Sequence, residues 1–137
     1  MAAVPELLRS EADGKVSFGN HTLDQKAKLD NFSSGGDVYK VKTYSALTKL
    51  EKNGMFLYES VPGTSIENFA EEANGVSFSV SGNEDAQITL GMKDDTEYEV
   101  FVAGESAGKM STGLGGKLSV SVELAGMGEV PVKVVEA

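Results

Sequence analysis

Residues 96–124, TEYEVFVAGESAGKMSTGLGGKLSVSVEL, decide the fold that we expect for this chain. Tyr98, Val100 and Val102 fall on one side of an extended chain, and the same period of two recurs from Leu118 to Val122. Between these runs, glycine-containing turns bound a short segment, residues 107–110, that can return as an antiparallel strand. Three successive strands predict a meander, and its apolar face needs a second layer to cover it.

Length and composition set the broad class. A chain of 137 residues is the size of one domain or of two small ones. It contains no cysteine, so disulfides, thiolate metal sites and thiol nucleophiles are excluded. We identify no apolar run long enough for a membrane helix and no signal-peptide pattern at the start, and we expect no membrane partner. The expected location is cytoplasmic, or secreted if a signal peptide had been removed.

Charge is distributed unevenly between the two halves. Residues 1–60 hold eight basic and eight acidic side chains, whereas residues 61–137 hold four lysines against thirteen acids, which accounts for the net charge of −9. An acidic surface repels phosphate backbones, so we expect no nucleic acid partner. Between Lys26 and Lys52 lysines outnumber acids six to three. This basic segment is interpreted as a solvated face, with contact to an acidic face of another copy as the alternative.

The first half predicts a helix and several strands. Residues 4–9, with Pro5 near the start, favour one or two helical turns. Residues 15–18 and 38–44 alternate as strands, the second with its more apolar face at Tyr39, Val41 and Thr43. Asn53-Gly54 predicts a hairpin between residues 47–52 and 55–60, although the spacing of leucines also permits a helix over residues 44–52. Residues 24–37 show no convincing period.

The second half reads as an antiparallel sandwich. Val76, Phe78 and Val80 alternate with serines, and about six short strands follow one another at intervals of roughly ten residues from there. Residues 66–73 are acidic and weakly patterned. The last strand, residues 130–135, carries Pro131, which predicts a sheet edge or a bulge. His21, the only histidine, is expected on the surface.

Two resemblances add to this interpretation. The segment DDTEYEVFVAGESAGKMSTGLGGKLSVSVEL resembles the second half of fibronectin-III-like or immunoglobulin-like β-sandwich modules, which often lie at the ends of bacterial polysaccharide-degrading enzymes. With YKVKTYSALTKLEKNG and YESVPGT, the chain is also similar to small uncharacterised bacterial proteins that sometimes carry an endosialidase label. A sialidase of the usual kind clamps its substrate with several arginines, and Arg9 is the only arginine of this chain.

The sequence lacks the spacing of the common catalytic and metal-binding motifs. No G-x-S-x-G elbow presents a serine to His21, and residues 108–117 lack the spacing of a phosphate-binding loop. Acidic turns such as 83–85 and 94–95 offer oxygens that suit calcium, but no EF-hand spacing occurs. We therefore expect no catalytic residues, no metal site and no cofactor, and the sequence favours a non-catalytic role over an enzymatic one without deciding between them.

The sequence predicts a mainly β fold: an antiparallel immunoglobulin-like or fibronectin-III-like β-sandwich with a short N-terminal helix and an N-terminal hairpin region. We expect a β-rich region over residues 1–62 and an acidic sandwich over residues 63–137, or one continuous domain. Tyr39 and Tyr58 are the candidate ligand-binding residues, because aromatic rings stack on sugars.

The hypothesis for function is a non-catalytic binding or interaction module that takes a protein partner, another copy of itself or a glycan. The alternatives are a small glycan-acting hydrolase or its accessory carbohydrate-binding domain, and a structural assembly protein.

Overall fold

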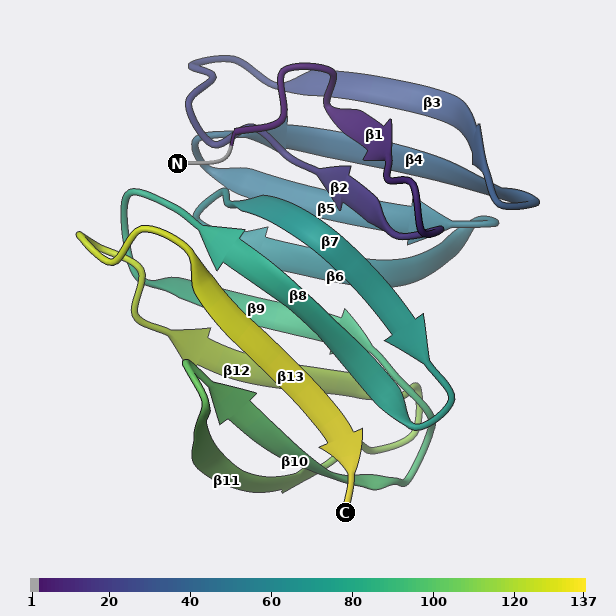
Figure 1. Ribbon diagram of the computed structural model, residues 1–137, viewed down its shortest axis with the longest axis vertical. Helices are drawn as coiled ribbons and strands as arrows, with labels where there is room; N and C mark the ends of the chain where they lie inside the picture. Colours follow the sequence, from purple (N-terminus) through teal and green to yellow (C-terminus); the bar gives the residue numbers. More distant parts are fainter. Residues whose placement is uncertain (1–2) are drawn as a thin grey trace.

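The computed structural model describes residues 3–137, which form two antiparallel β-sheets that face each other, with no helix among them (Figure 1). The strands are β1 (Leu8–Ser10), β2 (Val16–Phe18), β3 (Ala27–Ser34), β4 (Asp37–Tyr44), β5 (Leu47–Lys52), β6 (Met55–Val61), β7 (Ser65–Glu72), β8 (Gly75–Ser81), β9 (Ala86–Gly91), β10 (Glu97–Val102), β11 (Glu105–Ser111), β12 (Lys117–Val122) and β13 (Val130–Glu136). The expectation of a mainly β chain with two facing antiparallel layers is confirmed.

The two layers differ in size. Sheet A has seven strands in the order β1-β2-β7-β8-β13-β10-β11, and sheet B has six in the order β12-β9-β6-β5-β4-β3. Apolar side chains of both sheets meet between the layers, where Tyr58 of sheet B lies edge-on to Phe18 of sheet A with ring centroids 5.2 Å apart. Phe69 and Phe78 complete this aromatic cluster. Edge-to-face contacts of this kind add stability beyond the buried area itself.

The predicted N-terminal helix is wrong. Residues 4–9 lead through turns into β1, and Leu7 has a backbone φ of 70°, which a right-handed helix excludes. Val4 donates its N–H to the carbonyl of Gly19, and Leu7 accepts one from the N–H of Gly19. Val4 is fully buried. A helix of six residues is marginal in isolation, so pairing with the rest of the fold decides the local structure.

The predicted meander over residues 96–124 is only half right. β10 and β11 pair in sheet A as a hairpin, but β12 crosses to sheet B and pairs with β9. The glycine-rich loop between residue 111 and residue 117 makes this crossing. The alternation in β12 is confirmed, with Leu118, Val120 and Val122 buried and the residues between them exposed.

The strand that contains Pro131 lies inside sheet A. β13 pairs with β8 on one side and with β10 on the other, so the expected sheet edge is wrong. Pairing with β10 begins at Val132, one residue after the proline, and Pro131 accepts a hydrogen bond from the N–H of Ala103. Proline is therefore tolerated near the start of this central strand, because the backbone hydrogen bonds to β10 begin only after it.

The strongest sequence signals of the first half are confirmed. β4 buries Tyr39, Val41 and Thr43, and β5 and β6 form a hairpin around Asn53-Gly54, whose φ angles are 53° and 80°. Positive φ at both turn residues matches the twist of the strands that it joins. The alternative helix over residues 44–52 is thereby excluded.

Two strands lie in segments that the sequence left without a pattern. β3 and β7 each contain a β-bulge, at Asn31 with a φ of 58° and at Asn68 with a φ of 57°. A bulge inserts an extra residue and reverses the inside–outside alternation partway along the strand. The period of two is broken for that reason, although both segments are paired over most of their length.

Residue 62 marks no division in either sheet. β2 pairs with β7 across this position in sheet A, and β6 pairs with β9 across it in sheet B. One continuous cluster of buried apolar side chains runs from Leu8 to Val134. Both sheets and the buried cluster between them thus continue across residue 62.

Candidate functional site

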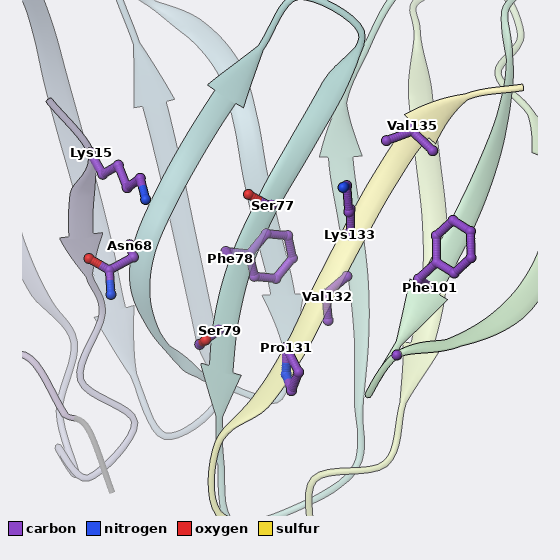
Figure 2. Close-up of a pocket in the computed structure, with 11 residues that line it drawn as sticks. Lys15, Asn68, Ser77, Phe78, Ser79, Phe101, Pro131, Val132, Lys133 and Val135 are labelled. Atoms are coloured by element: carbon purple, nitrogen blue, oxygen red, sulfur yellow. The ribbon is translucent and has the colours of Figure 1, made fainter. Parts of the chain in front are cut away.

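An open groove of about 770 Å³ crosses the outer face of sheet A (Figure 2). We call it the sheet A groove. The side chains that line it come from alternate positions of β8, β13 and β10. Lys15 and the bulge of β7 close one side of the groove. Its lining residues include Lys15, Asn68, Ser77, Ser79, Phe101, Pro131, Lys133 and Val135. Because successive strand residues point to opposite faces, these side chains share the face away from the core.

Three different chemical groups stand in one row across the groove. Lys133 of β13 lies opposite Ser77 of β8 and, on its other side, opposite Phe101 of β10. Neighbouring strands are about 4.8 Å apart. A hydroxyl, an ammonium group and an aromatic ring are thus presented side by side on adjacent strands. Figure 2 shows these three side chains on the same face.

A second row of side chains, beside the first, adds a polar group and a flat apolar ring to the surface of the groove. Ser79 of β8 lies opposite Pro131 of β13, two residues along each strand from the first row. Asn68 reaches the groove because the β7 bulge displaces it from the regular ladder. Lys15 is paired with Asp13 at 3.3 Å, whereas Lys133 forms no ion pair within residues 3–137. Lys133 is therefore the cation of the groove that is open to a ligand.

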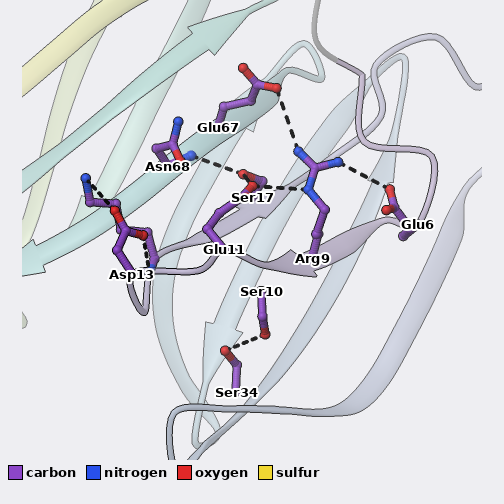
Figure 3. A network of polar contacts seen from close by, with 10 residues as sticks. Glu6, Arg9, Ser10, Glu11, Asp13, Ser17, Ser34, Glu67 and Asn68 are labelled. Atoms are coloured by element: carbon purple, nitrogen blue, oxygen red, sulfur yellow. Dashed lines mark hydrogen bonds and ion pairs between the residues drawn. The ribbon is translucent and has the colours of Figure 1, made fainter.

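A network of charged side chains adjoins the groove on β1, β2 and β7 (Figure 3). Arg9 donates from Nε to the Glu11 carboxylate at 3.1 Å, and its terminal nitrogens lie 3.5 Å from Glu6 and 3.7 Å from Glu67. Ser17 donates to the same Glu11 carboxylate and accepts from the N–H of Asn68 at 3.1 Å. Hydrogen bonds from Ser17 and Arg9 hold the pKa of Glu11 below its usual value. The network fixes β1 and β2 against the bulged strand.

Two carboxyl groups interact directly at this end of sheet A. The pKa of Glu67 is raised, first by a hydrogen bond shared with Glu129, then by burial and by the negative charge of Glu129. Arg9 acts in the opposite direction. Glycosidases that use two carboxyl groups hold them about 5 to 10 Å apart so that the sugar and water fit between them. The close interaction with Glu129 that raises the pKa of Glu67 does not match that separation.

The predicted ligand-binding tyrosines lie in the interior. Tyr58 is fully buried, and its hydroxyl contacts the Thr64 hydroxyl at 2.8 Å. Tyr39 is 7% exposed on the inner face of β4. Both rings therefore pack in the interior of the sandwich.

His21 is buried, so the expectation of a surface histidine is wrong. It is 3% exposed, and its Nδ1 lies 2.6 Å from the Ser65 hydroxyl. Burial lowers the pKa of His21 below its usual value. Because Ser65 is also buried, this histidine–serine pair has no open face toward a substrate, and we assign it to the packing of the loop after β2 on β7.

The acidic turns are explained in part by backbone capping. The Asp85 carboxylate accepts hydrogen bonds from the backbone N–H groups of Leu124 and Ala125, at 2.9 and 3.2 Å. These bonds connect the turn before β9 to the segment that follows β12. Among residues 3–137, no three histidine or acidic side chains come together in a way that could hold a metal ion. The same residues include no helix of the length and apolarity needed to cross a membrane.

Comparisons with protein-family models, with curated proteins and with solved structures found no match for this chain. The groove residues were not singled out from the sequence either. Phe101 and Lys133 alternate with buried neighbours in β10 and β13, which predicts that both side chains point away from the core. They lie in one row only because β13 pairs with β10. That pairing joins strands separated by two others in the chain, and no local signal reports it.

Proposed function

We propose that this chain is a non-catalytic binding module that holds a glycan strand with acidic substituents along the sheet A groove. The row of Ser77, Lys133 and Phe101 on three adjacent strands is the observation that supports it. Sugar rings offer an apolar face to an aromatic side chain and hydroxyl groups to polar ones. An unpaired ammonium group adds attraction for a carboxylate or sulfate.

The shape of the groove favours an extended ligand over a compact one. The groove is open, and its polar side chains are distributed along β8 and β13 with no single deep pocket among them. Pro131 and Val135 extend the apolar surface on either side of the row. A polymer that contacts several rigid strand positions gains affinity without ordering any loop, because the side chains are held by the sheet beneath them.

The test is direct binding to defined glycans. An array with neutral, uronic-acid and sulfated oligosaccharides is probed with the purified chain, and positive sugars are titrated by calorimetry. We expect Phe101→Ala to weaken binding about tenfold or more, in line with the loss of one stacking contact. Lys133→Gln is expected to remove the preference for acidic over neutral sugars.

A matched control lies on the other sheet. Lys28→Gln removes the same charge from an exposed residue of β3, outside the groove, and is expected to leave glycan affinity unchanged. Binding that is insensitive to Phe101→Ala and Lys133→Gln, or no binding to any sugar on the array, contradicts the proposal.

A glycan-acting hydrolase is the second candidate, and the raised pKa of Glu67 beside the groove is the observation in its favour. A general acid needs such a pKa, but it also needs a separate carboxylate across the substrate. Release of reducing sugar from a bound glycan, abolished by Glu67→Gln, would support this alternative. The resemblance to immunoglobulin-like and fibronectin-III-like modules stays a prediction about kinship, and the proposal does not depend on it.

A further inference from the structure

The two sheets have four edge strands, and those at one end of the sandwich are obstructed. β1 has only three residues, and its Ser10 hydroxyl donates to that of Ser34 on β3 at 2.7 Å. β3 carries the bulge at Asn31 and the exposed charges of Lys28 and Asp30. Short edges, bulges and charges are the means by which natural sheets prevent another strand from adding to them.

The other end has one irregular and one regular edge. β11 pairs with β10 through a register shift between Val100 and Phe101, and Gly108 within it has a φ of 107°. β12 pairs with β9 without any shift, from Lys117 opposite Gly91 to Val122 opposite Ala86. It contains no proline, glycine or bulge. β12 is therefore the edge, among the four described, that offers a regular row of backbone groups.

The sequence of β12 is complementary to itself in the antiparallel direction. Residues 117–123 read KLSVSVE. If two copies pair about Val120, Lys117 of each lies opposite Glu123 of the other. On the inner face Leu118 then meets Val122, and on the outer face Ser119 meets Ser121. A shift by two residues in either direction keeps the faces matched but removes both charge pairs.

The charged ends of this segment are unpaired in the single chain. Neither Lys117 nor Glu123 forms an ion pair within residues 3–137. The ammonium group of Lys117 lies 4.8 Å from the centre of the Phe56 ring, and Glu123 is exposed at the end of the strand. Opposite charges directly across an antiparallel pair are stabilising, and like charges are destabilising.

The edge strand of sheet A on the same side, β11, has small residues at its centre. β11 follows β10 at the end of sheet A and is joined to β12 by the loop of residues 112–116 (Figure 1). Its central residues, Ser106, Ala107 and Gly108, are small and exposed.

From these observations we propose that β12 is a homodimer interface, in which two copies pair antiparallel about Val120 and join their six-stranded sheets into one. The partner is a second copy of this chain, chosen by the reciprocal Lys117–Glu123 contacts. The interface lies in sheet B, so it is independent of the sheet A groove and of whatever binds there. A twofold contact of this kind is closed and stops at the dimer.

Sedimentation over a wide range of protein concentration tests the interface. We expect a monomer–dimer equilibrium in the wild type. Lys117→Glu and Glu123→Lys each place two like-charged pairs in the dimer and should weaken dimerisation by about tenfold or more. The double variant Lys117→Glu/Glu123→Lys restores both attractive pairs and should recover dimerisation. All substitutions are at exposed positions, and unchanged thermal unfolding verifies that each variant folds.

The charge-matched control is Lys28→Glu on β3. It changes the net charge by the same amount as Lys117→Glu but lies at the opposite edge of sheet B, so dimerisation should be unaffected. If Lys28→Glu disrupts association while Lys117→Glu does not, the contact runs through the basic segment and the proposal is wrong. It is equally overturned if the wild type stays monomeric at every concentration, or if the double variant fails to recover.

Cysteine cross-linking tests the register, and the absence of native cysteine keeps the result clear. Ser119 of one copy is expected opposite Ser121 of the other. Under mild oxidation, a mixture of Ser119→Cys and Ser121→Cys chains should form the mixed disulfide faster than either variant forms one with itself, because only directly opposed residues have a suitable separation. Equal rates in all three samples would contradict pairing about Val120.

Discussion

The hydroxyl of Tyr58 lies 2.8 Å from the hydroxyl of Thr64, and both residues are fully buried between the sheets. Thr64 also contacts Ser60 at 2.7 Å, and its backbone N–H and carbonyl both bond to the Thr48 hydroxyl, at 3.0 and 2.7 Å. The segment between β6 and β7 is thus held at the core by side-chain hydroxyls. Satisfied networks of this kind specify one arrangement of the elements that they join.

Tyr58→Phe is expected to destabilise the protein by about 1 kcal/mol at neutral pH, since Thr64 keeps its contact with Ser60 when the phenol is removed. Burial raises the pKa of Tyr58 well above the usual value near 10. The unfolded chain therefore loses this proton at a lower pH than the folded one. The stabilising contribution is complete below pH 10 and decreases as pH rises beyond it, by up to about 1.4 kcal/mol per pH unit.

Urea unfolding at pH 7 and at pH values above 10 measures this effect. The wild type should lose stability faster with rising pH than Tyr58→Phe, so that the difference between them shrinks and then reverses. Identical slopes for the two proteins would mean that Tyr58 does not resist ionisation in the folded state.

Glu129→Gln is expected to stabilise the protein at pH 7. The pKa of Glu67 is raised in the folded protein. Glu67 therefore stabilises the fold below the usual carboxyl pKa, and this stabilisation is lost as pH rises through the pKa that Glu67 has in the folded state. Removing the charge of Glu129 lowers the pKa of Glu67. The free energy of unfolding at neutral pH should then rise by roughly 0.5 kcal/mol, which is the scale of interactions between partly exposed charges. Near pH 3, well below the raised pKa of Glu67, the gain should vanish.

Unfolding midpoints at the two pH values provide the measurement. Glu84→Gln removes the same charge from an exposed turn residue and serves as the control. A gain for Glu129→Gln that is no larger than for Glu84→Gln, or that persists at pH 3, would show that the Glu67–Glu129 repulsion is absent.

Gly75→Ala is expected to destabilise the protein by roughly 1–3 kcal/mol, as overpacking does. A Cβ at Gly75 would lie 1.8 Å from the carbonyl oxygen of Val134, so β8 and β13 would have to separate. Gly113→Ala is the control, because a Cβ there meets nothing within 4 Å and the residue has no positive φ. Thermal unfolding of both variants tests the prediction, and equal midpoints would contradict the close approach of the two strands.

Ala103→Asn is expected to stabilise the protein by about 0.5–1 kcal/mol. Ala103 has a φ of 54° in the two-residue turn between β10 and β11, where alanine is strained and asparagine is favoured before glycine. The variant reproduces the Asn-Gly turn that the chain already uses at Asn53-Gly54. Ala107→Asn, at an exposed position of β11, should give no such gain in the unfolding midpoint.

Sequence patterns predicted the fold wherever the strands are regular and the signal is local. β4, β10 and β12 alternate cleanly, and Asn53-Gly54 specified its hairpin. β3 and β7 were missed because the bulges at Asn31 and Asn68 break the period of two. The N-terminal helix was wrong because residues 4–9 owe their structure to contacts with Gly19, which no helical signal includes.

The candidate site was beyond the reach of these patterns for a related reason. Tyr39 and Tyr58 were chosen by residue type, whereas the side that a strand residue faces depends on which sheet covers it. Phe101 and Lys133 meet only because β13 inserts beside β10. His21 was expected at the surface, and its burial depends on Ser65, forty-four residues away.

The position of β13 also has a consequence for biosynthesis. A ribosome makes the other strands of sheet A first, yet β8 and β10 have no common neighbour until β13 emerges to lie between them. Until then the nascent chain holds two pieces of sheet A that are not joined to each other. Sheet A can therefore close only after β13 has been made, and pairing between strands so distant in the chain is intrinsically slow.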